Sequence, residues 1–168
     1  MLVPGEGNYA LIKPLVGYRR DIEMQMREYP FDRNVFLMMK FRESNRDLGE
    51  FIIESLHNHG LNGVRADQAE WNITDNLFNP IAVLYCCKYG VALFDGADGR
   101  QAYSPNVAYE LGMMHYQNKS CLILRHSSLP EVPFDLLKDL YVTYDHDLQV
   151  RREIAKWIGQ VRARRRRY

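Results

Sequence analysis

The segment SPNVAYELGMMHYQNK, residues 104–119, places a glutamate where a carboxylate can do chemistry. Ser104 is suited to cap a helix and Pro105 to occupy its first turn, so the segment predicts a helix. Apolar residues then repeat at helical spacing and should face a core: Val107, Leu111 and Met114. Glu110 lies at the edge of that stripe, beside Asn106 one turn earlier. A carboxylate on a rigid helix can attack an electrophilic carbon or stabilise a developing cation. We expect the nearby helix N-terminus to favour its ionised form.

The chain that must position this glutamate alternates between short apolar runs and helical patterns. Nearly continuous apolar runs are typical of buried parallel strands, and they occur at residues 34–39, 62–66, 91–95, 120–125 and 140–144. Helical patterns occur at residues 18–29, 44–60, 72–90 with a kink near Pro80, 104–119 and 148–161. This alternation predicts a three-layer α/β fold with a five-stranded parallel sheet. The order 2-1-3-4-5 follows because right-handed crossovers leave few alternatives.

Such a sheet binds ligands at the carboxyl ends of its strands, near the switch point between strands 1 and 3. Side chains that follow the first three strands are therefore the expected lining of the cleft: Lys40, Phe41, Arg42, Arg65, Asp67 and Asp95. Asn106 and Glu110 join them from the helix after the third strand. Glu110 is thus predicted to face a cleft.

Several of these segments resemble the TIR-like and nucleoside 2-deoxyribosyltransferase-like superfamily. The likeness spans residues 33–144 and rests on VFLMMKF, GVRAD, NITDNLFNPI, VALFD, SPNVAYELGMMHYQNKSCLIL and LPEVPFDL, of which NVAYELG is the most specific. Members are flavodoxin-like α/β domains that attack an N-glycosidic bond, in NAD or in a nucleoside, through one helix-borne glutamate. The resemblance implies that this glutamate is Glu110. It also assigns the accompanying motif positions to Asn106, Arg65, Asp67 and Asp95.

The implied reaction suits the residues at these positions. Breaking a ribosyl–nitrogen bond passes through an oxocarbenium-like state, whose positive charge Glu110 can stabilise or attack. Asn106 and Asp67 carry groups that can hydrogen-bond ribose hydroxyls and so fix the sugar. An equally simple interpretation of Asp67 is an ion pair with Arg65 within one loop.

Other side chains of the predicted cleft have two interpretations each. Phe41 or Tyr103 can stack on a base or on nicotinamide, although Phe41 also fits a core position. Arg42 or Arg65 can hold phosphate if the substrate is a dinucleotide. Asp95, at the end of a predicted strand, can bind substrate or simply form a turn.

Composition narrows the setting. With 46% hydrophobic and 26% charged residues, a chain of 168 residues can bury the core of one globular domain. The net charge is only +1, and no basic face matches the run RARRRR at 162–167, so nucleic-acid and membrane binding are not expected. Three cysteines and the absence of metal, GxGxxG and P-loop motifs predict no disulfide framework, metal or resident cofactor. NAD enters only as a substrate.

The expected organisation has three parts. Residues 1–30 form an N-terminal extension, 31–161 a TIR-like α/β domain and 162–168 a basic C-terminal tail. We expect a cytoplasmic protein without a signal peptide. We also expect it to form a homo-oligomer, because related sites often need self-association to be completed.

Three functions fit these residues. The first is NAD cleavage by a TIR-like enzyme, through hydrolysis or cyclisation, in bacterial antiviral defence or nucleotide signalling. The second is a nucleoside 2-deoxyribosyltransferase or nucleoside hydrolase of salvage metabolism. The third is a TIR-like module that binds a nucleotide or a partner and catalyses nothing. The N-terminal extension and arginine-rich tail favour the first.

Overall fold

The computed structural model describes residues 10–96, 104–129 and 141–165, and it contains the predicted parallel sheet. Five strands follow the order β2-β1-β3-β4-β5, and every neighbouring pair is parallel. Their bounds are β1 Asn34–Met38, β2 Asn62–Val64, β3 Tyr89–Phe94, β4 Ser120–His126 and β5 Tyr141–Tyr144. The predicted fold class and strand order are therefore confirmed.

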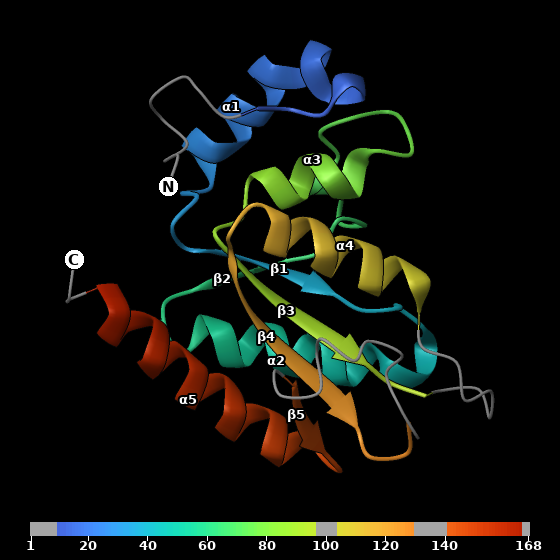
Figure 1. Cartoon of the computed structure of the whole chain (residues 1–168), viewed down its shortest axis with the longest axis vertical. Coiled ribbons are helices and arrows are strands. Elements are labelled where there is room, and N and C mark those ends of the chain that lie inside the picture. Colours follow the sequence, from blue (N-terminus) through green and yellow to red (C-terminus); the bar gives the residue numbers. More distant parts are fainter. Residues whose placement is uncertain (1–9, 97–103, 130–140, 166–168) are drawn as a thin grey trace.

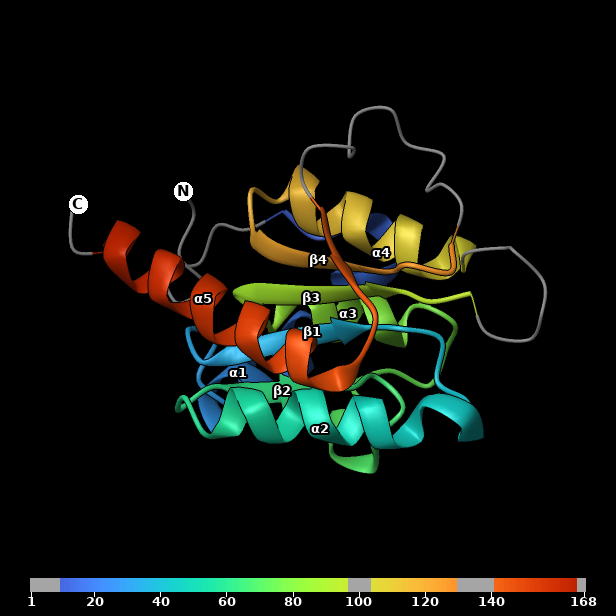
Figure 2. The same cartoon turned by 90° about the horizontal axis from the view of Figure 1, so that it is seen from below.

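Helices cover both faces of this sheet. The α-helices are α1 Arg19–Glu28, α2 Arg46–His57, α3 Asn79–Tyr85, α4 Pro105–Tyr116 and α5 Asp147–Arg165. Three short 3-10 helices accompany them, η1 Lys13–Tyr18, η2 Glu43–Asn45 and η3 Ala69–Trp71. One face carries α1, α3 and α4, while α2 and α5 lie on the other (Figure 1). Seen along the sheet, β4, β3, β1 and β2 stack one below the other in that order (Figure 2).

Alternating side chains of the central strands build two cores. In β1, Phe36 and Met38 face α3 and α4, whereas Val35 and Leu37 face α2 and α5. All four are at most 1% exposed. Because both sides of the strand are covered, its sequence reads as one apolar run, which is why the pattern predicted a parallel sheet.

The predicted helix over 72–90 is wrong in its extent. Residues 72–78 are irregular, and α3 begins only at Asn79. Pro80 lies in the first turn of α3 and does not kink a longer helix, because its missing N–H has no partner there anyway. The last helix is longer than the predicted 148–161, since arginine and alanine continue it to Arg165.

The segment before β1 shares the core of the α/β unit. Leu15 of η1 and Ile22 of α1 are fully buried, in the same apolar cluster as Ile81 of α3. The predicted boundaries at residues 30 and 162 stay predictions. Among the described helices, none is long and apolar enough to cross a membrane.

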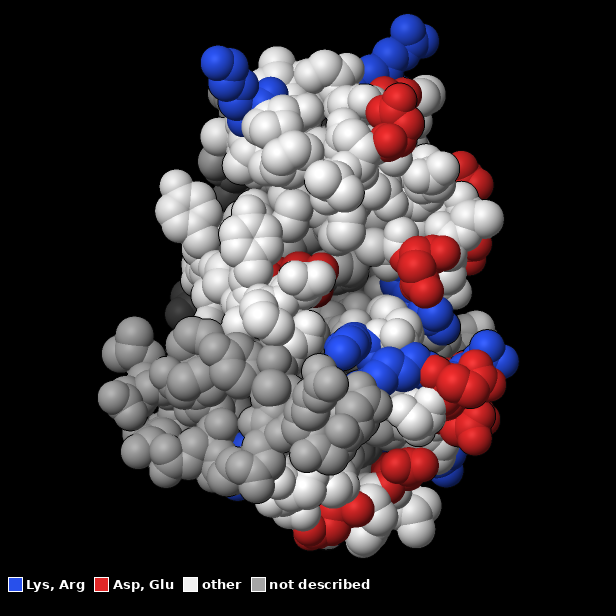
Figure 3. Space-filling model, turned by 90° about the vertical axis from the view of Figure 1, so that its right-hand side faces the viewer, with Lys and Arg blue, Asp and Glu red and all other residues white. Residues whose placement is uncertain are grey.

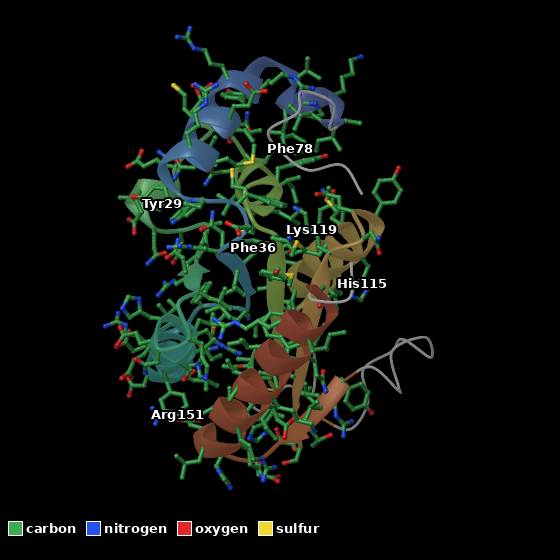
Figure 4. The ribbon with its side chains drawn as sticks, turned by 90° about the vertical axis from the view of Figure 1, so that its left-hand side faces the viewer. Tyr29, Phe36, Phe78, His115, Lys119 and Arg151 are labelled. Carbon is green, nitrogen blue, oxygen red and sulfur yellow. The ribbon has the colours of Figure 1, made fainter. Side chains whose placement is uncertain are left out.

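A half-buried lysine links α3 to the start of β4. The Lys119 ammonium donates to the Leu84 carbonyl over 2.7 Å, and its nitrogen lies 5.5 Å from the ring centroid of Phe31 (Figure 4). Burial lowers the pKa of Lys119 to about 8, since charge is poorly solvated at that position. The charged form of Lys119 therefore lowers the stability of the fold.

Candidate active site

A pocket of about 200 Å³ opens where β1 and β2 end, between these strands and the helices α3 and α4. Its walls bring together three of the predicted site residues, Phe41, Asp67 and Glu110. Pro80 and apolar side chains of β1 complete the lining. On the face at which the strands end, a small, partly covered acidic group is visible near the middle, with basic side chains below it (Figure 3). The site thus has the position expected for a doubly wound sheet.

Burial shifts the pKa of Glu110, which lies in the wall of this pocket. Its side chain is half-buried on α4, and burial raises its pKa from 4.5 to about 7. Within the described residues its carboxylate makes no hydrogen bond or ion pair. The helix N-terminus was expected to favour the ionised form, and burial acts on the pKa in the opposite direction. Near neutral pH the group is poised between its two forms.

The start of α4 differs from the prediction in one detail. Ser104 occupies the N-cap position and Pro105 the first turn, but the serine side chain makes no capping hydrogen bond. Asn106 is exposed, one turn before Glu110, and does not line the pocket. Tyr103 lies outside the described residues.

The loop after β2 holds a second polar group at the pocket. Arg65 donates two hydrogen bonds to Asp67, from Nε at 2.9 Å and from Nη2 at 2.6 Å. The guanidinium carbon of Arg65 also lies 3.9 Å from the ring centroid of Phe41. The ion pair considered from the sequence is therefore present, and it places Asp67 beside an aromatic ring.

Arg42 and Asp95 bond each other across the ends of β1 and β3. Arg42 Nη2 donates to Asp95 Oδ1 over 2.7 Å, and Asn45 Nδ2 donates to Asp95 Oδ2 over 2.9 Å. Each side chain of the ion pair is only 13% exposed. Each carboxylate oxygen of Asp95 thus accepts a hydrogen bond, and the pair fixes the loop that carries Phe41.

Two asparagines that sequence reasoning missed hold the loops of this site. Asn45 is buried, donates to the Lys40 carbonyl and accepts from the Arg42 amide. Asn79 accepts from the amides of residues 73 and 74, and donates to the carbonyls of residues 66 and 71. The Asn-Pro dipeptide at 79–80 was the available signal, because such pairs mark turns and helix starts.

A metal centre has no support in the part of the chain that the structure describes. No group of three or more His, Cys, Asp or Glu side chains there is arranged to hold an ion.

The strand order and the position of the pocket define an α/β protein with a flavodoxin-like fold. A similar solved structure is the CMP N-glycosidase of Clostridium botulinum, with a TM-score of 0.55 and 18% identity over 74% of this chain and 98% of that one. A 2-deoxyribosyltransferase from Bacillus psychrosaccharolyticus aligns with a TM-score of 0.45 and 14% identity, over 70% and 90% of the two chains.

The comparisons with sequences add no family. No protein-family model matches the chain, and no curated protein is significantly similar to it. The likeness to the CMP N-glycosidase confirms the predicted fold, and membership of the TIR-like and nucleoside 2-deoxyribosyltransferase-like superfamily stays a prediction.

Proposed function

We propose that this protein cleaves the N-glycosidic bond of a nucleoside or nucleotide, with Glu110 as the catalytic carboxylate. The observation that carries the proposal is a half-buried glutamate without a polar partner among the described residues, in a pocket at the carboxyl ends of the strands. The structural likeness to a CMP N-glycosidase supports the same reaction class.

The chemistry follows from the charge of the transition state. As the base departs, the ribose ring oxygen shares its electrons and positive charge appears at the anomeric carbon. The Glu110 carboxylate can attack that carbon to give a covalent ribosyl ester, or balance the charge while water attacks. Because no described group competes for its electrons, the full interaction is available to the sugar.

Two neighbours are suited to position the substrate. Asp67 is half-exposed at the pocket wall and can accept hydrogen bonds from ribose hydroxyls on the oxygen lone pairs that Arg65 leaves unused. Phe41 presents an aromatic ring, one face of which Arg65 already covers. Asn106, exposed one turn before Glu110, is suited to reach a hydroxyl from the rim.

The size of the pocket and the ion pairs of the two nearby arginines favour a mononucleoside unit over a dinucleotide. A volume of about 200 Å³ holds one ring system, below the range common for larger ligands. Arg42 is bonded to Asp95 and Arg65 to Asp67, so a carboxylate already balances the charge that each arginine would offer to a phosphate. NAD cleavage, by hydrolysis or cyclisation in antiviral defence or signalling, is the second candidate.

The test is to incubate the full chain separately with cytidine, CMP, deoxynucleosides and NAD, and to identify released base or nicotinamide by mass spectrometry. Wild-type protein should release base from a nucleoside or nucleotide, and Glu110→Gln should not. Glu50→Gln is the matched control, because Glu50 is an exposed glutamate on α2, on the other face of the sheet. Ligand binding without release from any substrate would contradict the proposal and favour a binding module.

A further inference from the structure

A second and larger pocket lies at the opposite end of the sheet. Its volume is about 420 Å³, within the range common for ligand sites. It is formed by the segments that precede β1 and β2, by the first residue of β3 and by the C-terminal half of α5. It lies at the end of the molecule that Figure 4 faces. Among the described residues, none lines both this pocket and the one that contains Glu110.

The floor of this amino-end pocket is aromatic. Tyr89 of β3 and Trp157 of α5 meet edge to face, with ring centroids 5.9 Å apart. Trp157 is 7% exposed, and its indole N–H has no hydrogen-bond partner among the described residues. The two rings give the pocket an aromatic floor on which a flat ring can pack.

The rim of the pocket is cationic. Arg33 and Arg162 contribute two positive charges against one carboxylate, Asp32. The Arg33 guanidinium has no ion pair or hydrogen bond within the described chain, whereas Asp32 already interacts with another group. Arg162 donates to the backbone carbonyl of His59, which holds its side chain at the rim. Arginine is the residue best suited to grip an oxyanion.

We propose that the amino-end pocket binds a small molecule made of one flat aromatic ring system and one anionic group. The ring packs on Tyr89 and Trp157, and the anion lies between Arg33 and Arg162. The site is separate from the glycosidic chemistry and does not depend on it. Replacing Glu110 by glutamine should therefore leave binding here unchanged.

Nuclear magnetic resonance offers a reporter inside the pocket. The chain has two tryptophans, and each indole N–H gives its own signal, which Trp71→Phe assigns. Trp71 is 2% exposed and lies outside this pocket, so it is an internal control. Naphthalene sulfonate, added to the full chain, should move the Trp157 signal in a saturable way and leave the Trp71 signal in place.

Neutral and ring-free probes separate the two halves of the proposed ligand. Naphthol keeps the ring and methanesulfonate the charge, and each should bind at least about tenfold more weakly than naphthalene sulfonate. Arg33→Gln with Arg162→Gln should weaken the sulfonate by about tenfold or more. Arg20→Gln, an exposed arginine of α1, should not change it.

Three results would overturn the proposal: an unmoved Trp157 signal, equal affinity for naphthol, or unchanged affinity in the folded double arginine variant. Thermal melting of each variant shows whether it is folded.

Discussion

Replacing Glu110 by glutamine should stabilise the fold and abolish turnover at the same time. Burial raises the folded-state pKa from 4.5 to about 7, so the native protein binds this proton more tightly than the unfolded chain. Wild-type stability therefore falls as pH rises from about 4.5 to 7, and the cost is fully present above pH 7. This difference in pKa corresponds to about 3 kcal/mol of folding free energy at most. Glutamine, which cannot ionise, avoids it.

The measurement is urea unfolding of both proteins at pH 5 and pH 8. At pH 8 the glutamine variant should be more stable by as much as about 3 kcal/mol, and at pH 5 by about 1 kcal/mol or less. Glu50→Gln should show no such dependence, since that side chain is exposed. Equal stabilities at pH 8 would refute the reasoning that burial, without a polar partner, sets the ionisation of Glu110.

Turnover should change in the opposite direction. The amide neither attacks nor balances a cation, so the loss should be about a thousandfold or more, roughly 4 kcal/mol of barrier. In the wild type, kcat/KM should rise from pH 5 to about 7 and then level, because the ionised form is the active one. A folded glutamine variant that cleaves its substrate undiminished would remove Glu110 from the mechanism.

Four further changes test the surroundings. Asn106→Ala should lower turnover by about ten- to a hundredfold through lost orientation of the sugar, in the same release assay. Asn45→Ala should lower the free energy of unfolding in urea by about 2 kcal/mol, because buried groups lose their partners. Removing residues 162–168 should leave turnover on saturating substrate within a few-fold, and a hundredfold loss would show that the tail builds the site. Between pH 8 and 10.5 the folded wild type loses the charge of Lys119, which burial disfavours, and so becomes more stable. The free energy of unfolding of Lys119→Met, relative to that of the wild type, should therefore decrease over this interval, by about 3 kcal/mol at most. Parallel slopes in urea titrations across that interval would contradict the last expectation.

The fold could be predicted because its signals are local and repeat. β1 and β3 are buried on both faces, so each appears in the sequence as a continuous apolar run. The segment 72–78 could not be predicted, because its amides bond to the side chain of Asn79 and not to a helical backbone. Such side-chain bonds leave no periodic pattern.

The partners within the site were harder to predict than its location. The strand-end rule brought Arg42 and Asp95 to the same edge, although 53 positions separate them. It could not say whether they bond each other or a substrate, because that depends on side-chain reach and on Asn45 between them. The amino-end pocket was missed for a similar reason. Helical spacing places Trp157 inward but does not show that neighbouring loops leave space beside it.

Two effects of different size act on the ionisation of Glu110, and only the smaller one was considered from the sequence. A helix N-terminus favours a carboxylate by about 0.3–1 kcal/mol, and the effect fades beyond the first turn, where Glu110 lies. Burial raises the pKa from 4.5 to about 7, which corresponds to roughly 3 kcal/mol in the other direction. Desolvation is therefore the larger of the two effects. This balance suits the proposed reaction. A cation that develops beside Glu110 lowers its pKa again as the bond breaks, so the interaction is larger in the transition state than with the neutral sugar. A fully solvated carboxylate would gain less, because water already balances its charge.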